Sequence, residues 1–466
     1  MSVAASTHAM ARFVARSTGL RRPTLAVPDP ALPTLPDLKK LAQDRRAAGL
    51  PVIDQSAGDI SDVGQPLHPD FPAWIQEARS QLLAAGCMAL QATAGDAYGF
   101  PGNYQQQYPQ VLDVLANSWR VTSPFRGLQT VSGRAALDFV LRGLLARAGA
   151  VSNPCILLDP LAWSGYQPLC ADLGIQIVNV PALTEGLSTC AQALSEGIQF
   201  AKQQQMTPIA TIPILPSNPT GVGLSPEALI AYIEAAAIAD LPVLIDAFYS
   251  PLAPQGHAAA ISMDVLSQRL SPEVLAGVGL LVGETKVTSS QNKTASILWM
   301  APSGHERTAN TIIAVATKRM KTTNSYPRPQ EALVAYALHT FPGGVHTAMG
   351  PRYAALNTTR QAMKASCDRL ALPLSIGGSF YGTVGLVTDE GLALVRDRDG
   401  RPLTAPADVS RALIERFGLV GAPGGMFSSA PEAGQLVRLT AAVSLDDVQR
   451  VESILEQMRD EALRLG

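Results

Sequence analysis

Short apolar runs alternate with helical patterns through the middle of this chain, and this alternation constrains the fold more than any other feature. Apolar runs of strand length occupy residues 155–158, 174–180, 209–215, 242–245 and 278–282. Strands that are separated by helices pair in parallel through right-handed crossovers. The sequence therefore predicts an α/β domain with a mostly parallel sheet covered by helices.

The length of 466 residues predicts two domains, because a single core rarely grows that large. A proline-rich stretch at 23–36 predicts an extended linker before a helix near 38–48. Beyond position 328, a helical region precedes glycine-punctuated strands and a helix predicted at 444–458, which is typical of a smaller α+β domain. We therefore divide the chain into an N-terminal arm and linker (1–36), a part that packs with the small domain (37–90), a large domain that carries the candidate site (91–328) and a small domain (329–466).

The composition argues against several classes of function. The net charge of −2, with acids and bases interspersed, gives no electrostatic basis for binding nucleic acid. No stretch of about 20 residues is sufficiently free of charges to span a membrane. The five cysteines form no C-x-x-C pair and the six histidines form no H-E-x-x-H motif, so neither a disulfide framework nor a metal site is expected.

The scattered cysteines favour a reducing compartment, and we expect a cytoplasmic protein. Residues 1–28 allow a second interpretation, because they contain four arginines, several hydroxyl residues and no acid. Such a composition is compatible with a transit peptide, which would place the protein in an organelle matrix. The alternative is an arm that packs on the body of the protein or on a partner subunit.

Polar residues stand where the predicted strands end, which is where open α/β sheets bind ligands. Ser132-Gly133-Arg134 opens a helix predicted at 133–147, and a helix N-terminus with a hydroxyl and a guanidinium suits a phosphate group. Taken alone, Ser132 is more typical of an ordinary N-cap. Trp163 offers a flat face to a ring, although tryptophan more often belongs to a core.

Two strand ends carry ionisable groups. Asp246 ends the run 242–245, where a buried carboxylate needs a cation unless it only caps a turn. Lys286 follows the run 278–282, and partial burial makes such an amine a nucleophile. An anion site, a stacking face, a carboxylate and an amine together match a phosphorylated, protonated heteroaromatic aldehyde, for which pyridoxal 5′-phosphate is the obvious candidate.

The segment Asn218-Pro219-Thr220-Gly221, followed by Asp246-x-x-Tyr249 at the family spacing, resembles the class I/II aminotransferases. These are fold-type I pyridoxal phosphate enzymes that include aspartate aminotransferase, and the resemblance extends from about Asp59 to the C-terminus. It implies a large domain with a mostly parallel mixed sheet and a smaller α+β domain. It also implies a homodimer with shared active sites.

Roles for individual residues follow from the same resemblance. Asp246 would bind the ring nitrogen, and Lys286 would form the internal aldimine and shuttle the α-proton. Arg438 would hold the substrate α-carboxylate with Gly58 nearby, and Tyr98 would reach the phosphate in the neighbouring subunit. The remaining implied contacts are those of the ring hydroxyl with Asn218 and Tyr249, the ring face with Trp163, the phosphate with Ser132, Gly133 and Arg134, and the substrate with Asn218.

The lysine segment departs from the family pattern of S-x-S-K or S-x-A-K. Here it reads Gly283-Glu284-Thr285-Lys286, so the first serine, a phosphate ligand, is missing. The arginine expected shortly after the lysine is also absent, and Lys293 is a candidate to replace it, while Arg134 is a candidate to restore phosphate contacts. In a second alignment, Lys293 is itself the lysine that binds the cofactor. We favour Lys286, since it lies nearer the strand end.

The resemblance implies an aminotransferase that moves an amino group from an L-amino acid to a 2-oxo acid through the Lys286 aldimine. The same residues also suit a lyase, racemase, cyclase or synthase that uses this cofactor. A non-catalytic binding or regulatory protein with this fold is a third hypothesis. Lys321 or Arg328 is a candidate for the cation that would hold an acidic substrate. The sequence does not indicate which amino donor or acceptor is used.

Overall fold

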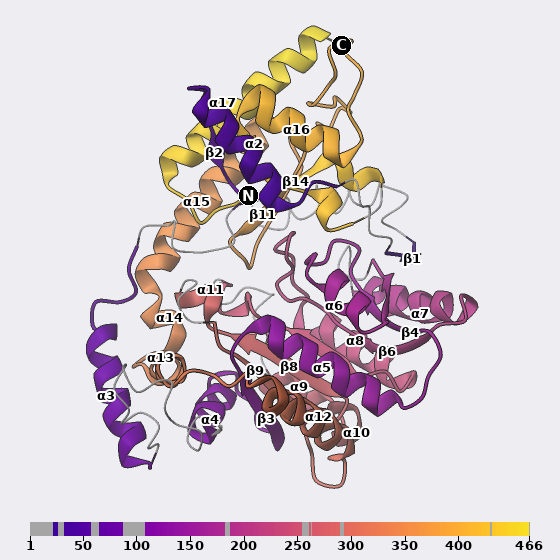
Figure 1. The fold of residues 1–466 in the computed structure, drawn as a ribbon, viewed down its shortest axis with the longest axis vertical. Coiled ribbons are helices and arrows are strands. Elements are labelled where there is room, and N and C mark those ends of the chain that lie inside the picture. The colour runs from indigo at the N-terminus through magenta and orange to yellow at the C-terminus, as the bar shows by residue number, and fades with distance from the viewer. Residues whose placement is uncertain are drawn as a thin grey trace.

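The computed structural model describes residues 22–26, 32–56, 65–86, 108–181, 187–253, 261, 263–288, 293–428 and 431–465. These residues form two lobes (Figure 1). The large lobe contains an eight-stranded sheet covered by helices, and the small lobe contains a four-stranded sheet with its own helices. Helix α15 (Gly350–Arg369) runs from one lobe to the other.

The large sheet has the strand order β1-β5-β4-β6-β7-β8-β9-β3. Strands β5, β4, β6, β7 and β8 are parallel, β9 is antiparallel to both of its neighbours, and β1 is antiparallel to β5. The predicted α/β fold with a mostly parallel mixed sheet is thus confirmed. The strands are β1 (Thr24–Leu25), β3 (Phe125–Thr130), β4 (Pro154–Leu158), β5 (Gln176–Asn179), β6 (Thr207–Thr211), β7 (Val243–Asp246), β8 (Val278–Gly283) and β9 (Ala295–Met300).

All five apolar runs form strands, but two of these strands are shorter than predicted. Strand β6 ends at Thr211 rather than at position 215, and beyond it Ile214 forms only an isolated bridge with Asp246. Proline explains the difference, since Pro213 and Pro216 have no N–H to donate to a ladder. The run predicted at 174–180 also narrows, to Gln176–Asn179 in β5.

Helices cover both faces of the large sheet, and successive strand residues point to opposite layers. Leu244 packs in the layer that contains α5 and α12, whereas Val243 and Ile245 pack in the layer that contains α7 and α8. Burial on both faces explains why the strands read as continuous apolar runs. The helices of this part are α4 (Pro109–Ser118), α5 (Gly133–Ala148), α6 (Tyr166–Asp172), α7 (Leu187–Gln203), α8 (Pro226–Ile238), α9 (Met263–Arg269), α10 (Pro272–Leu275), α11 (Thr285–Thr288) and α12 (Arg307–Thr323).

The small lobe is built on an antiparallel sheet with the order β10-β11-β14-β13. Helix α2 follows the proline-rich stretch and packs Leu38 and Ala42 against Ile414 and Val420 of this lobe. Strand β2 pairs with β12 beside it. The elements are α2 (Leu35–Ala47), β2 (Ile53–Asp54), β10 (Leu374–Ile376), β11 (Tyr381–Gly385), α16 (Pro406–Phe417), β12 (Leu419–Val420), β13 (Ala422–Pro423), β14 (Leu436–Thr440) and α17 (Leu445–Leu465), the last of which is longer than the predicted 444–458.

Three further helices connect these parts. Helix α3 (Phe71–Ala84) contacts α13 (Pro329–Thr340), and α14 (Gly344–Ala348) leads into α15.

The division of the chain into domains at positions 36, 90 and 328 stays a prediction. None of the helices within the described ranges is long and apolar enough to cross a membrane.

Candidate active site

A cavity of about 730 Å³ lies between the two lobes, at the carboxyl ends of β7 and β8. Its wall includes ten of the residues that were singled out from the sequence. Gly58 and Tyr98 lie outside the described residues, and their placement is left open. The ten are Ser132, Gly133, Arg134, Trp163, Asn218, Asp246, Tyr249, Lys286, Lys293 and Arg438. The structure brings them together, while their chemical roles stay predictions.

The N-terminus of α5 lies at this cavity. The Ser132 Oγ caps the helix by accepting a hydrogen bond from the Ala135 N–H at 3.2 Å. The two N–H groups before it, those of Gly133 and Arg134, have no partner within the helix and belong to residues of the cavity wall. A Cβ at Gly133 would lie 2.8 Å from the tip of the Phe248 ring, so a side chain there would require that ring to shift. The Arg134 guanidinium lies 5.7 Å from the centroid of the Trp163 ring.

Asp246 is the buried carboxylate of the cavity. Its Oδ2 accepts a hydrogen bond from the Tyr166 hydroxyl at 2.7 Å, and its Oδ1 accepts one from the Phe248 N–H at 3.4 Å. Burial raises the pKa of Asp246 to about 6, although Tyr166, the Phe248 N–H and nearby Lys286 all act to lower it. These partners therefore compensate the buried charge only in part, and a cation bound beside Asp246 would stabilise it.

A chain of hydrogen bonds connects the two lobes across the cavity. Arg438 Nη1, from β14, donates to Asn218 Oδ1 at 3.0 Å, and Asn218 Nδ2 donates to the Tyr249 hydroxyl oxygen at 3.1 Å. Asn218 and Tyr249 are both buried. Burial raises the pKa of the Tyr249 hydroxyl well above its usual value, so it remains protonated. The two residues that the resemblance assigns to the ring hydroxyl are thus in contact with each other.

Arg438 is a buried cation with a specific surrounding. Its Nη2 donates to the Ser56 carbonyl at 3.1 Å, and its guanidinium lies 3.9 Å from the Tyr381 ring centroid and 5.4 Å from that of Phe427. Its Nε is buried without a hydrogen-bond partner, and no carboxylate among the described residues forms an ion pair with it. A guanidinium in this state suits a carboxylate ligand, which accepts two hydrogen bonds.

The two candidate lysines differ in position. Lys286 lies in α11, directly after β8, and its Nζ lies 5.6 Å from the Tyr249 ring centroid and 6.0 Å from that of Phe380. It is half-buried and close enough to Asp246 to lower the pKa of that carboxyl. Lys293 also lines the cavity, but its side chain is exposed. This difference favours Lys286 as the reactive amine.

The segment before Lys286 is anchored in the interior. The Glu284 carboxylate is buried, accepts a hydrogen bond from the Thr294 hydroxyl at 3.2 Å and lies 3.2 Å from Nε2 of His339. The other ring nitrogen of His339 lies 2.9 Å from the Ser118 hydroxyl. The lysine segment is therefore attached both to the residue just before β9 and to α13.

Several residues that line the cavity or contact its wall were not found from the sequence. Tyr166, the hydrogen-bond donor to Asp246, lies three positions after Trp163, where only its place at the start of α6 distinguishes it. Tyr381 and Phe427 flank Arg438 but lie far from it in sequence, and no local pattern connects them. The carbonyl of Ser56 carries no sequence signal at all, because any residue presents one.

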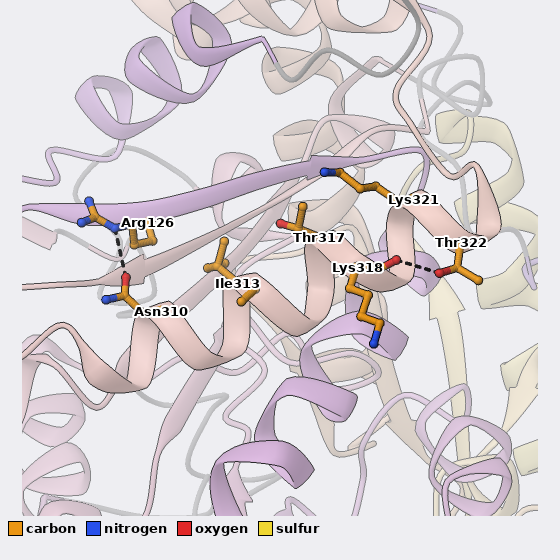
Figure 2. Close-up of a pocket in the computed structure, with 8 residues that line it drawn as sticks. Arg126, Asn310, Ile313, Thr317, Lys318, Lys321 and Thr322 are labelled. Atoms are coloured by element: carbon orange, nitrogen blue, oxygen red, sulfur yellow. Dashed lines mark hydrogen bonds between the residues drawn. The ribbon is translucent and has the colours of Figure 1, made fainter. Parts of the chain in front are cut away.

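A second hollow, of about 630 Å³, lies on the outer face of the large lobe between β3 and α12 (Figure 2). Arg126 donates to Asn310 there at 3.2 Å, while Lys318 and Lys321 point in different directions. All four of these side chains are exposed, so they do not form a converging, desolvated site. Lys321 thus lines this outer hollow. Arg328, also exposed, precedes α13.

Comparisons with known proteins agree with this architecture. The sequence model of the family described as "Aminotransferase class I and II" matches residues 62–455. No curated protein sequence matches the chain.

Similar solved structures include an aspartate aminotransferase double mutant from Thermus thermophilus. Its sequence is 18% identical and its TM-score is 0.65, and the match covers 91% of this chain and 96% of the mutant's chain. An archaeal alanine:glyoxylate aminotransferase is 16% identical with a TM-score of 0.67, at 92% and 96% coverage. The aspartate aminotransferase from Rhizobium meliloti is 15% identical with a TM-score of 0.66, at 93% and 99% coverage. At these identities the likeness shows the fold alone.

Proposed function

Because the chain belongs to the class I and II aminotransferase family, whose members depend on pyridoxal phosphate, we propose that it moves an amino group from an L-amino acid to a 2-oxo acid in the cavity between the lobes. One observation carries this proposal. The cavity combines a buried carboxylate, a half-buried amine and a buried arginine that has no acidic partner among the described residues. These are the groups needed for a protonated ring, a covalent attachment and a substrate carboxylate.

The residues present fit the cofactor. A volume of about 730 Å³ is ample for a small organic group, since ligand pockets commonly span about 300–1,000 Å³. Asp246, whose charge is only partly compensated, would hold a protonated ring nitrogen. The start of α5, with Arg134, would hold the phosphate, and Asn218 with Tyr249 would hold the ring hydroxyl. Trp163, at the same wall, would cover one face of the ring.

When bound, the cofactor supplies a conjugated ring that accepts the electron pair left behind by the α-proton. Asp246 would keep that ring protonated, because a buried carboxylate stabilises an adjacent positive charge. Lys286 would supply the amine that holds the cofactor covalently and, once released, would take up and return the α-proton. The Lys286 Nζ lies over the Tyr249 ring, and this position keeps the amine near Asp246.

Arg438 would orient the substrate. A bidentate guanidinium–carboxylate pair contributes about 1.5–3 kcal/mol and fixes the direction of the Cα–H bond relative to the amine. The stacking of Arg438 on Tyr381 and its bond to the Ser56 carbonyl restrict the guanidinium before any ligand binds. Asn218, which accepts from Arg438, would contact substrate and cofactor together.

Two variants test the identity of the amine. Lys286→Ala and Lys293→Ala are purified, reconstituted with pyridoxal phosphate and dialysed. We expect the wild type and Lys293→Ala to retain the visible absorbance of a lysine-bound cofactor, and Lys286→Ala to lose it. Retention by Lys286→Ala together with loss by Lys293→Ala would overturn the assignment in favour of Lys293.

The reaction type is tested by single-turnover mixing of the loaded enzyme with a panel of L-amino acids. Transamination predicts a 2-oxo acid in stoichiometric amount, together with conversion of the cofactor to its amine form. A spectral change without conversion of the cofactor to its amine form would contradict transamination and would favour a lyase, racemase, cyclase or synthase.

A further inference from the structure

The turn that carries Asn218 belongs to the large lobe, yet its buried carbonyls are held by side chains of the small lobe. The Thr383 hydroxyl, from β11, donates to the Pro219 carbonyl at 2.9 Å. The Ser375 hydroxyl, from β10, donates to the Thr220 carbonyl at 2.8 Å. Thr383 and Ser375 are each 1% exposed, so water cannot replace them as donors.

The two hydroxyls and Arg438 form a single row across the small sheet. Ser375 is paired with Thr383, and Thr383 is paired with Arg438, so the three side chains share one face of neighbouring strands. Arg438 donates to the Asn218 side chain. The order along the row, β14, β11 and β10, therefore matches the order of positions 218, 219 and 220 along the turn.

The contact continues past this row. The Gly378 N–H, in the loop between β10 and β11, donates to the Gly221 carbonyl at 3.0 Å. Gly221 has a φ of +70°. A Cβ there would lie 3.1 Å from the backbone nitrogen of Gly377 and 3.1 Å from the Tyr381 carbonyl oxygen. The turn is thus docked along its length on the edge of the small lobe, and glycine is required for that approach.

We propose that Ser375 and Thr383 are positioning residues for the transfer reaction: their hydroxyls fix the turn so that Asn218 bridges Arg438 and Tyr249. This inference rests on the proposed function, because it gives Arg438 the substrate carboxylate and Tyr249 the cofactor. The consequence is that the groups for substrate and cofactor are held by one unit that spans both lobes. A shift of the small sheet relative to the turn would displace both sets of groups at once.

A simpler role is that the hydroxyls only satisfy two buried carbonyls. Both roles predict a loss of stability when a hydroxyl is removed, so stability does not separate them. Positioning also predicts that the turn becomes more open to exchange and that ligands of Arg438 bind more weakly. It further predicts that restoring the hydroxyl alone restores both properties.

The variants are chosen to change the hydroxyl and little else. Thr383→Val removes the hydroxyl at constant shape, and Thr383→Ser keeps it. Ser375→Ala is a smaller change that repeats the test if Thr383→Val folds poorly. Thr359→Val is the matched control, because the Thr359 hydroxyl is also buried in the small lobe and donates to a carbonyl, that of Ala441, at 2.6 Å.

The first measurement is hydrogen exchange of the segment 213–224 in the cofactor-free protein. The Ser217 and Gly221 amides donate to the Val222 and Ser217 carbonyls within the turn, at 2.7 and 2.8 Å. We expect roughly tenfold faster exchange of this segment in Thr383→Val and Ser375→Ala, the factor that corresponds to one buried hydrogen bond. Thr383→Ser and Thr359→Val should exchange as the wild type does in this segment.

The second measurement is the affinity of the loaded enzyme for 2-methylalanine, which has an α-amine and an α-carboxylate but no α-hydrogen to remove. Thr383→Val should weaken binding roughly tenfold, and Thr383→Ser should restore it. Wild-type exchange and affinity in Thr383→Val, or no restoration by Thr383→Ser, would overturn the proposal. If the wild type does not bind 2-methylalanine, the proposed function fails, and the exchange data alone decide whether the hydroxyls position the turn.

Discussion

Asp246 should make the stability of the cofactor-free protein depend on pH in a direction that can be worked out. Burial raises its pKa from 3.8 to about 6. An acid whose pKa is raised on folding binds its proton more tightly in the folded state, so the folded state is favoured at low pH. That contribution is complete below pH 3.8 and is lost as the pH rises through 6.

The magnitude follows from the two pKa values. At pH 8 the buried carboxylate lowers the free energy of unfolding by about 3 kcal/mol. This value is the difference between the two pKa values, 3.8 and about 6, multiplied by 1.36 kcal/mol for each pKa unit. About half of this penalty remains at pH 5, and little remains at pH 4. Asp246→Asn removes the penalty at every pH, because an amide stays neutral and its oxygen still accepts the hydrogen bond from Tyr166.

Urea unfolding of the two cofactor-free proteins between pH 4 and pH 8 measures this difference. We expect Asp246→Asn to be more stable than the wild type by up to about 3 kcal/mol at pH 8, with a margin that closes toward pH 4. Asp113→Asn, at an exposed aspartate of α4, should show no such margin. A wild type that is as stable as Asp246→Asn at pH 8, or a margin that persists at pH 4, would refute the reasoning.

Two further predictions concern the cavity and the lysine segment. The described wall around Arg438 includes the apolar side chains of Met426 and Phe427, so apolar amino donors should be preferred to acidic ones. Met426→Arg should raise kcat/KM for glutamate about tenfold relative to leucine. An unchanged ratio in a panel of amino donors would contradict this. Removing either partner of the buried Glu284–His339 contact, as Glu284→Gln or His339→Phe, should cost about 1–3 kcal/mol of unfolding free energy. The double variant should lose less than the two single losses combined, and strict additivity in urea titrations would show that the pair does not interact.

The large lobe could be predicted from the sequence because its signals are local. A buried strand in a parallel sheet is a short apolar run, and the residue that follows it stands at the ligand-binding edge. Asp246 and Lys286 were found in this way and Asn218 through the family motif, and the structure brings all three to one cavity. The main error in this lobe was also local, since Pro213 and Pro216 end β6 earlier than hydrophobicity alone suggests.

The contribution of the small lobe could not be predicted, because it depends on contacts between distant segments. Ser375 and Thr383 read as ordinary strand residues, and only the docking of the two lobes shows that they hold the turn near Asn218. Tyr381 likewise becomes a site residue only when β11 and β14 pair and place it on Arg438. A single sequence contains no pattern for such pairings, since each depends on the register of a whole sheet.

The departure in the lysine segment has a steric cause in Phe248. A Cβ at Gly283, where the family pattern has serine, would lie 2.4 Å from the Phe248 ring and 2.8 Å from the Thr294 carbonyl. The same ring would have to shift to make room for a side chain at Gly133. One aromatic residue therefore fills the space between the start of α5 and the end of β8, and a serine at position 283 would require both a smaller residue at position 248 and a shift of the Thr294 backbone. A positive charge is nevertheless available to bind an anion at this end of the cavity, because Arg134 lines the same wall.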